Sequence, residues 1–145
     1  MKTKSFSQSD FNKIKEQVIS LLKEERNIIA VYIFGSIVND YATPHSDIDL
    51  GVLFKKNFNF KQELLIGARL ESELKRKVDL INLNRTSVNL AFRIISTGIL
   101  ILENDSLLLS DYLENLFSQY HDFIIDYKHF LKEYNKSLEE YFLNA

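Results

Sequence analysis

A small flexible pair, Gly35-Ser36, ends one apolar run of the sequence, and two aspartates open the next. The first run covers residues 28–34, and the second expected strand covers residues 47–54, with a polar loop between them. Both runs are short and rich in aliphatic and aromatic residues, which predicts two largely buried strands. Residues two apart in a strand point to the same face, so Asp47 and Asp49 direct their carboxylates to one side.

Two carboxylates held this close repel each other, and each tends to raise the pKa of the other. A divalent cation between them removes the repulsion, and oxygen ligands suit Mg²⁺ better than Zn²⁺. A third carboxylate, Asp79, lies near the start of another expected strand, residues 78–83. If that strand pairs beside residues 47–54, three carboxylates converge, and two metal ions could clamp a triphosphate there. Gly35 would let the backbone approach phosphate, and Ser36 offers a hydroxyl and an N–H.

The motif as a whole resembles a known superfamily. Gly35-Ser36, ten intervening residues, Asp47-x-Asp49 and the later Asp79 resemble the DNA polymerase β-like nucleotidyltransferases. Within that superfamily the chain is similar to the minimal nucleotidyltransferases, in particular to the antitoxin of HEPN–minimal nucleotidyltransferase toxin–antitoxin pairs. Segments 78–85 and 97–103 also resemble later segments of that family, so the resemblance covers about residues 10–135.

The resemblance implies a role for each residue of the motif. Gly35 and Ser36 would hold the β- and γ-phosphates of ATP. Asp47 and Asp49 would bind Mg²⁺, and Asp79 would help to bind a second Mg²⁺ and accept the proton of the incoming hydroxyl. Antitoxins of this family transfer AMP to a tyrosine of the partner toxin and so block its ribonuclease activity. The resemblance therefore implies a Mg²⁺-dependent protein adenylyltransferase with a HEPN toxin as its partner.

The chain departs from the family pattern near the motif. Family members often carry Arg and Gly shortly after the Gly-Ser pair, where this chain has Asn39 and Asp40. The position before Ser46, which is often acidic in the family, is His45. These departures concern the phosphate contacts and the nucleotide preference, and they leave the three carboxylates in place.

The composition restricts the class of protein. A length of 145 residues suits a single domain over residues 1–145. A net charge of −2 gives little electrostatic attraction for free nucleic acid. The absence of cysteine excludes disulfides and thiolate metal sites and fits a cytoplasmic protein. No apolar stretch reaches the 18 residues of a membrane span, and the N-terminus lacks the apolar run of a signal peptide.

The remaining pattern predicts an α/β (α+β) fold, in which a small mixed sheet of about four strands is flanked by helices. We expect the catalytic core to span about residues 8–104. Helical spacing in the expected second helix places four apolar residues on or near one face. The further expected elements are a helix from Ser7 or Ser9 to about Glu25, that second helix over residues 60–76 with Leu64, Leu65, Ala68 and Leu74, a helix from Thr86 or Ser87 to Ser96 with Gly98 as its C-cap, and a strand over 99–103.

The C-terminal segment, about residues 106–144, is expected to be helical and to mediate association. Its apolar residues alternate at spacings of four and three, which is typical of a heptad seam. A single helix over residues 113–141 would be about 42 Å long, more than the ~30 Å of a small domain. Either the helix breaks or its distal part packs on a second copy or a helical partner. The seam comprises Leu113, Phe117, Tyr120, Ile124, Tyr127, Leu131, Tyr134, Leu138 and Tyr141, and Leu116, Phe123 and Phe130 widen it.

Several alternatives stay open at this level. The chain could instead act on a small molecule such as an aminoglycoside, or it could be a binding antitoxin that neutralises its partner by contact alone. Arg85 and Arg93 could each contact an anion or form a surface ion pair. The run Lys75-Arg76-Lys77 could attract phosphate, although a solvated charge run before a strand explains it as well.

Overall fold

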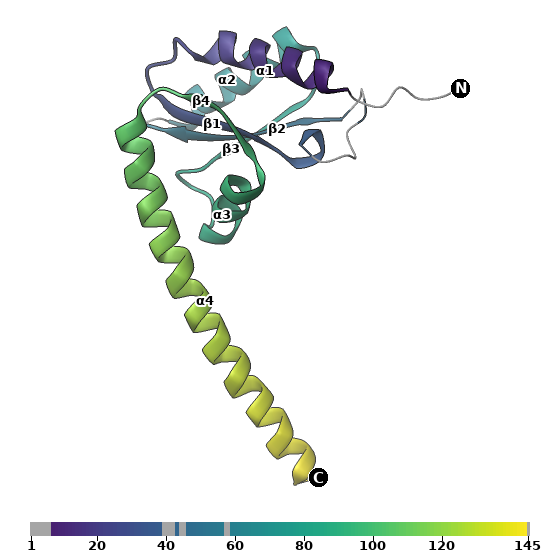
Figure 1. The fold of residues 1–145 in the computed structure, drawn as a ribbon, viewed down its shortest axis with the longest axis vertical. Coiled ribbons are helices and arrows are strands. Elements are labelled where there is room, and N and C mark those ends of the chain that lie inside the picture. Colours follow the sequence, from purple (N-terminus) through teal and green to yellow (C-terminus); the bar gives the residue numbers. More distant parts are fainter. Residues whose placement is uncertain (1–6, 39–42, 44–45, 57–58, 145) are drawn as a thin grey trace, which may run out of the picture.

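A four-stranded mixed sheet lies between two layers of helices in the computed structural model, which describes residues 7–38, 43, 46–56 and 59–144 (Figure 1). Strand β1 pairs antiparallel with β2 on one side and with β4 on the other, and β2 pairs parallel with β3. The strand order is therefore β3-β2-β1-β4, which confirms the predicted mixed sheet. Asn39, Asp40 and His45 lie outside the described residues. The strands are β1 (Ile28–Phe34), β2 (Ile48–Phe54), β3 (Val78–Asn82) and β4 (Ile99–Glu103).

Helices α1 (Gln8–Leu22) and α2 (Phe60–Leu74) cover one face of the sheet. Helix α3 (Val88–Thr97) and the first turns of α4 (Ser106–Leu143) cover the other. The core accordingly has two halves. The α1/α2 half contains Val18, Leu22, Ile48, Leu50, Val52, Leu70 and Leu74, and the α3/α4 half contains Tyr32, Leu53, Leu83, Ala91, Ile94, Leu109 and Leu116.

The helices begin where capping residues stop the preceding extended chain. Ser7 and Asp10 form a reciprocal capping box at the start of α1. Asn59 and Gln62 do the same for α2, and the Ser87 hydroxyl accepts a hydrogen bond from the Leu90 N–H of α3. The predicted starts of these helices are therefore confirmed, and Gly98 is the C-cap of α3 as expected. Helix α1 ends at Leu22, three residues before the predicted end.

The predicted face of α2 was wrong. Leu64 and Leu65 are 57% and 61% exposed, and Ala68 is exposed as well. The buried positions are Ile66, Leu70 and Leu74, so only Leu74 of the predicted set is in the core. Residues 66, 70 and 74 form a single row at a spacing of four, and this row is the one that meets the sheet.

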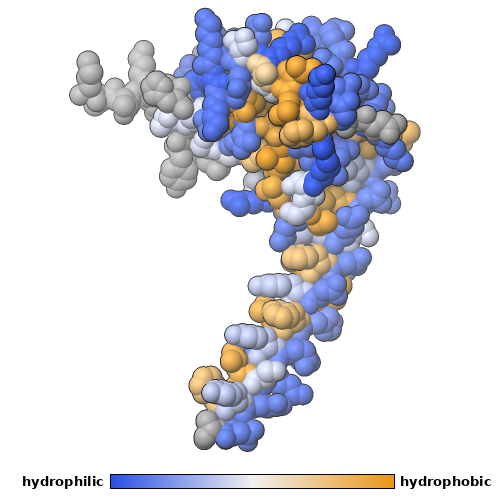
Figure 2. Space-filling view, turned by 180° about the vertical axis from the view of Figure 1, so that it is seen from behind, coloured by the Kyte–Doolittle hydropathy of each residue, from blue (hydrophilic) through white to orange (hydrophobic). Residues whose placement is uncertain are grey.

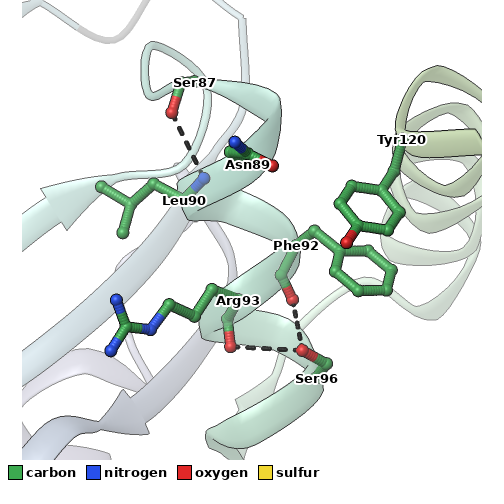
Figure 3. Close-up of a pocket in the computed structure, with 7 residues that line it drawn as sticks. All are labelled: Ser87, Asn89, Leu90, Phe92, Arg93, Ser96 and Tyr120. Atoms are coloured by element: carbon green, nitrogen blue, oxygen red, sulfur yellow. Dashed lines mark hydrogen bonds between the residues drawn. The ribbon is translucent and has the colours of Figure 1, made fainter. Parts of the chain in front are cut away.

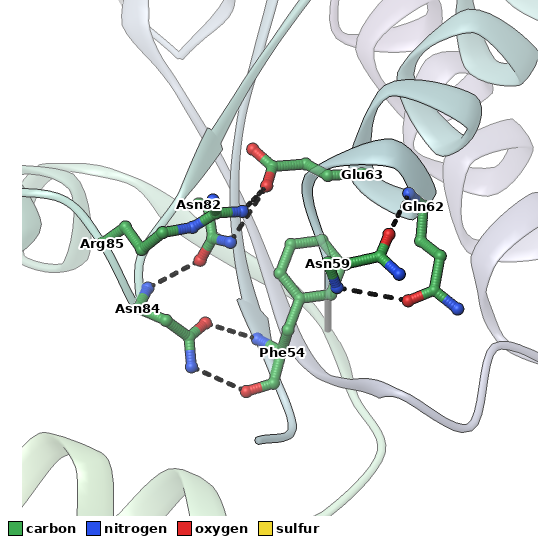
Figure 4. Close-up of polar contacts among 7 residues, drawn as sticks. All are labelled: Phe54, Asn59, Gln62, Glu63, Asn82, Asn84 and Arg85. Carbon is green, nitrogen blue, oxygen red and sulfur yellow. Dashed lines mark hydrogen bonds and ion pairs between the residues drawn. The ribbon is translucent and has the colours of Figure 1, made fainter. Parts of the chain in front are cut away.

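A polar cluster after β3 fixes the far end of the β2–β3 pair (Figure 4). The Asn84 side chain accepts from the Phe54 N–H and donates to the Phe54 carbonyl oxygen, both at 2.8 Å. Asn82 donates to the Glu63 carboxylate at 3.1 Å, and Arg85 forms an ion pair with the same carboxylate. Asn84 bonds both the N–H and the carbonyl oxygen of one residue of β2, as a paired residue of a neighbouring strand would. Asn84 therefore helps to hold the register between β2 and β3.

Helix α4 is continuous over 38 residues, about 57 Å, so the predicted long helix does not break. Only its first part packs on the domain, through the buried residues Leu109 and Leu116. Every described residue after Ile124 is exposed, and the helix projects away from the sheet (Figure 1). A band of apolar side chains follows this projecting part (Figure 2). No helix in the described part of the chain is both long and apolar enough to cross a membrane.

Candidate active site

Two of the predicted carboxylates are direct neighbours in the sheet. In the parallel β2–β3 pair Asp49 lies opposite Asp79, one position after Ile48 and Val78. Asp47 immediately precedes β2, two residues before Asp49. The conditional expectation that residues 78–83 pair beside the Asp47-x-Asp49 strand is therefore confirmed. The three residues open two adjacent strands at the same edge of the sheet.

The carboxylates of Asp49 and Asp79 belong to the α3 face of the sheet. Ile48, Leu50 and Val52 point into the α1/α2 half of the core. Side chains alternate along a strand, so Asp49, Gly51 and Leu53 point the other way, and Leu53 is packed with α3. By the same alternation Asp79 shares its face with Ile81, which also packs in the α3/α4 half. Asp79 is exposed and Asp49 is half-buried, so both residues are accessible to solvent.

Gly35 lies directly against the Asp49 carboxylate. Strand β1 ends opposite Asp49, with Phe34 as its register partner, and Gly35 follows. Gly35 has a φ of +80°, and a Cβ built on it would be 2.1 Å from Oδ2 of Asp49. Only glycine avoids both the left-handed strain and this collision. Gly35 and Ser36 then form a single 3₁₀ turn, Gly35–Ile37, in which the Val38 N–H donates to the Gly35 carbonyl at 3.1 Å.

The site is electrostatically unfavourable for a bare carboxylate. Burial raises the pKa of Asp49 above its usual value, and the negative charges of Asp79 and Asp47 raise it further. No cationic side chain is among the causes of this pKa shift. The repulsion shows that the three carboxylates interact, and a cation at this edge would lower the free energy of the ionised form.

The described residues hold no cluster of three or more His, Cys, Asp or Glu side chains in metal-binding geometry. Mg²⁺ in phosphate-transfer sites is usually held by one or two carboxylates, with waters and substrate phosphates completing the octahedron. The neighbouring Asp49 and Asp79, with Asp47 beside them, supply the oxygen ligands that this type of site uses.

A run of basic residues lies beside the carboxylates. The Arg76 guanidinium donates to the Ser46 carbonyl at 3.5 Å, and the Ile48 N–H donates to the Lys77 carbonyl at 2.9 Å. The run at residues 75–77 is therefore adjacent to the start of β2. A further basic residue, Arg93 of α3, lines a shallow pocket of about 540 Å³ between α3 and α4 (Figure 3).

The α3/α4 pocket was not predicted from the sequence. Its remaining lining residues are Ser87, Asn89, Leu90, Phe92, Ser96 and Tyr120. The Phe92 and Tyr120 rings stack with centroids 3.6 Å apart and an interplanar angle of 2°. The two residues are separated in sequence by a strand and a helix start, so no local pattern indicates that they meet.

Comparison with known proteins agrees with this geometry. The family model described as polymerase beta, nucleotidyltransferase matches residues 16–107. No protein with curated functional information matches the chain. Among solved structures, a chain of a toxin–antitoxin complex with AMP-PNP superimposes with a TM-score of 0.69 at 21% identity, covering 82% of this chain and 96% of that one.

Two further complexes have the same fold. A chain of the toxin–antitoxin complex MntA–HepT has a TM-score of 0.65 at 20% identity, covering 84% of this chain and 97% of that one. A chain of the tri-AMPylated Shewanella oneidensis HEPN toxin in complex with MNT antitoxin has a TM-score of 0.66 at 19% identity, with coverages of 85% and 97%. The family model spans all four strands of the sheet and every residue of the carboxylate motif, so this chain belongs to the polymerase β nucleotidyltransferase family.

Proposed function

We propose that the protein is an antitoxin that transfers AMP from ATP to a hydroxyl of a helical partner toxin of the HEPN type, most simply a tyrosine. The observation that carries this proposal is the adjacency of Asp49 and Asp79, with Gly35 against the Asp49 carboxylate. The matching solved structures, one with AMP-PNP and one with an AMPylated toxin, support the choice of nucleotide and acceptor.

We assign the binding of two Mg²⁺ ions to Asp47, Asp49 and Asp79. The carboxylates fit the ion because their mutual repulsion and the burial of Asp49 favour a bound cation. When bound, the ions would polarise the phosphates and stabilise the charge that develops on the leaving group. Gly35 and Ser36 would hold the β- and γ-phosphates, since Gly35 lacks a Cβ and the half-buried Ser36 follows it in the turn beside the Asp49 carboxylate.

The transfer is an in-line displacement at the α-phosphate. The acceptor hydroxyl oxygen forms a bond to the α-phosphorus while the bond to the bridging oxygen of the β-phosphate breaks, and pyrophosphate leaves. The hydroxyl proton passes to the Asp79 carboxylate, which is exposed on β3 and accessible to an approaching protein. Asp49 is the less suitable base, because it is half-buried and lies against Gly35.

We assign partner docking to the distal part of α4, which we define as residues 117–143. This part leaves a wide band of large apolar side chains exposed, including Tyr127 at 50%, Phe130 at 62% and Tyr134 at 53%. An apolar stripe along a projecting helix is the surface that packs into a groove between helices. The alternative use of this surface is self-association through residues 113–141. Neutralisation by contact alone, the alternative to AMP transfer, would use the same docking surface.

Intact-mass spectrometry tests the proposal. The chain is incubated with ATP, Mg²⁺ and a candidate HEPN partner, and both proteins are weighed. We expect the partner to gain one or more AMP units, and the Asp49→Asn/Asp79→Asn double variant to transfer none. Asp111→Asn is the matched control, because Asp111 is exposed on α4 and distant from the motif in sequence.

A partner that binds but never gains mass would contradict transfer to protein and favour the binding antitoxin. Transfer to an aminoglycoside in the absence of any protein acceptor would favour the small-molecule alternative instead.

A further inference from the structure

Arg93 projects from the side of α3 that faces away from α4. Figure 3 shows the Arg93 side chain directed opposite to Tyr120, whereas Phe92 points toward Tyr120. The stacking of Phe92 on Tyr120 fixes which side of α3 meets α4. Successive helix residues are rotated by 100°, so Phe92, Ile95 and Val88 occupy the α4 side and Leu90, Arg93 and Thr97 the opposite one.

Helix α3 lies over the same face of the sheet as the carboxylates. A Cβ on Gly51 would be 2.7 Å from Cγ2 of Ile94, so α3 crosses β2 at Gly51. Asp49 is two residues from Gly51 along the strand, about 6.6 Å, and points to the same face. Ile94 is the immediate neighbour of Arg93, so Arg93 lies one residue along α3 from the point at which the helix crosses β2.

The end of α3 also lies beside Gly35 and Ser36. A Cβ on Gly98 would be 2.9 Å from the Ile33 carbonyl oxygen and 3.2 Å from Cβ of Phe34, the residue before Gly35. In the last turn, the Ser96 and Thr97 hydroxyls donate to the Phe92 and Arg93 carbonyl oxygens at 2.7 Å and 2.6 Å. These bonds tie both hydroxyls back to their own helix, at carbonyls one turn before its end.

Arg93 is an exposed cation without an ion-pair partner among the residues that the structure describes. The other arginine that the sequence left undecided is committed elsewhere, because Arg85 pairs with Glu63 and lies 5.8 Å from the centroid of the Phe60 ring. Arg69 pairs with Glu25. The guanidinium group binds phosphate oxygens through two parallel hydrogen bonds, so an uncommitted arginine beside a nucleotide site suits this role.

We propose that Arg93 is a nucleotide-positioning residue that binds the β- or γ-phosphate of ATP from the α3 side. This inference deepens the proposed function and depends on it, because it requires ATP at the carboxylate site. Arg93 would bind the phosphates on the side opposite the basic run at residues 75–77. It would supply positive charge where the three aspartates and the triphosphate are all negative.

Titration calorimetry in the presence of Mg²⁺ tests the assignment on the intact chain. The dissociation constants of ATP and AMP are measured for the wild type, Arg93→Ala, Arg93→Lys and the control Arg85→Ala. We expect Arg93→Ala to weaken ATP binding about tenfold or more, as for a lost charge-assisted hydrogen bond, and to leave AMP binding within about twofold. Arg93→Lys should recover part of the loss, and Arg85→Ala should bind both nucleotides like the wild type.

Unchanged ATP binding by Arg93→Ala, or an equal loss of ATP and AMP binding, would overturn the assignment to the terminal phosphates. A thermal unfolding midpoint of Arg93→Ala equal to that of the wild type excludes a general loss of structure. A wild-type chain that binds no ATP would refute the proposed function itself. A wild type that transfers AMP while Arg93→Ala behaves identically would refute only the role of Arg93.

Discussion

The Cα of Gly35 lies so close to the Asp49 carboxylate that a single methyl group would be 2.1 Å from Oδ2. This contact joins the end of β1 to the start of β2 at the point where the proposed phosphate turn meets the proposed metal ligand. The φ of +80° at Gly35 is the backbone conformation that permits it. Gly35 is therefore needed for two reasons: it adopts a positive φ without strain, and it has no Cβ to collide with the Asp49 carboxylate.

Gly35→Ala should abolish AMP transfer and destabilise the fold. The positive φ alone costs about 1–2 kcal/mol for a residue with a Cβ, and the Asp49 side chain must also move. Thermal unfolding and transfer assays measure the two effects. Gly67→Ala is the matched control, because nothing lies within 4 Å of a Cβ at that helical position and alanine should stabilise α2 by about 0.5–1 kcal/mol. A Gly35→Ala variant with full activity would contradict the proposed role of this turn.

The stability of the metal-free protein should depend on the ionisation of Asp49. The pKa of Asp49 is raised in the folded state by burial and by Asp79 and Asp47. Folding is therefore favoured by protonation, and this contribution is fully present below the unfolded pKa and lost as pH rises through the raised folded pKa. We expect Asp49→Asn to remove this loss, so the stability of the variant should be less sensitive to pH in the window just above 3.8, the usual pKa of an aspartate carboxyl.

Urea unfolding between pH 4 and 7, with and without Mg²⁺, measures this dependence. Mg²⁺ should stabilise the wild type at the upper end of the range and have little effect on Asp49→Asn. A variant that shows the same pH dependence as the wild type would contradict the proposed electrostatic conflict.

The projecting part of α4 should be dispensable for folding. Tyr134 is 53% exposed and its ring stacks on the exposed Phe130 of the same helix, so Tyr134→Asp should change the free energy of unfolding by less than about 0.5 kcal/mol. Leu116 is 5% exposed in the α3/α4 half of the core, and Leu116→Ala should cost about 2–5 kcal/mol.

The Tyr134→Asp variant also tests docking. Tyr134→Asp should lower the affinity for the partner without affecting nucleotide binding, as measured by calorimetry on each ligand. An unchanged complex, together with a shift from dimer to monomer in light scattering, would assign the distal part of α4 to self-association instead.

Asn84→Ala should destabilise the protein by about 1–3 kcal/mol, because it removes both hydrogen bonds to Phe54. Asn135→Ala, on the exposed part of α4, should be neutral or slightly stabilising. Chemical denaturation measures both variants. Equal free energies of unfolding for Asn84→Ala and Asn135→Ala would show that the hydrogen bonds between Asn84 and Phe54 contribute nothing to stability.

The strands were the most predictable elements, because apolar runs bounded by Gly35 and by Asp47 leave little freedom for their ends. The predicted limits of residues 28–34 coincide with those of β1. Capping residues gave the helix starts, since Ser7 and Ser87 satisfy backbone N–H groups within their own helices. Strand limits and helix starts both depend on residues that are close together in the sequence, so the sequence alone predicts them.

Features that depend on distant neighbours were harder to predict. The apolar residues Leu64 and Leu65 suggested a buried face of α2, but the position of the sheet selected the row through Ile66 and Leu70. Arg85 and Arg93 were equivalent in the sequence, and only the approach of Glu63, 22 residues from Arg85, distinguished them. The neighbouring positions of Asp49 and Asp79 likewise required a parallel pairing across an intervening helix.

The length of α4 has a kinetic consequence for an enzyme whose acceptor is a protein. A partner bound along this helix would be tethered to the catalytic edge, so each transfer would proceed at a local concentration set by the geometry of the complex and not by the amount of partner in solution. Repeated modification of one partner molecule would then need no dissociation between steps. The number of groups added would be limited by how far the acceptor can reach along a rigid arm of about 57 Å.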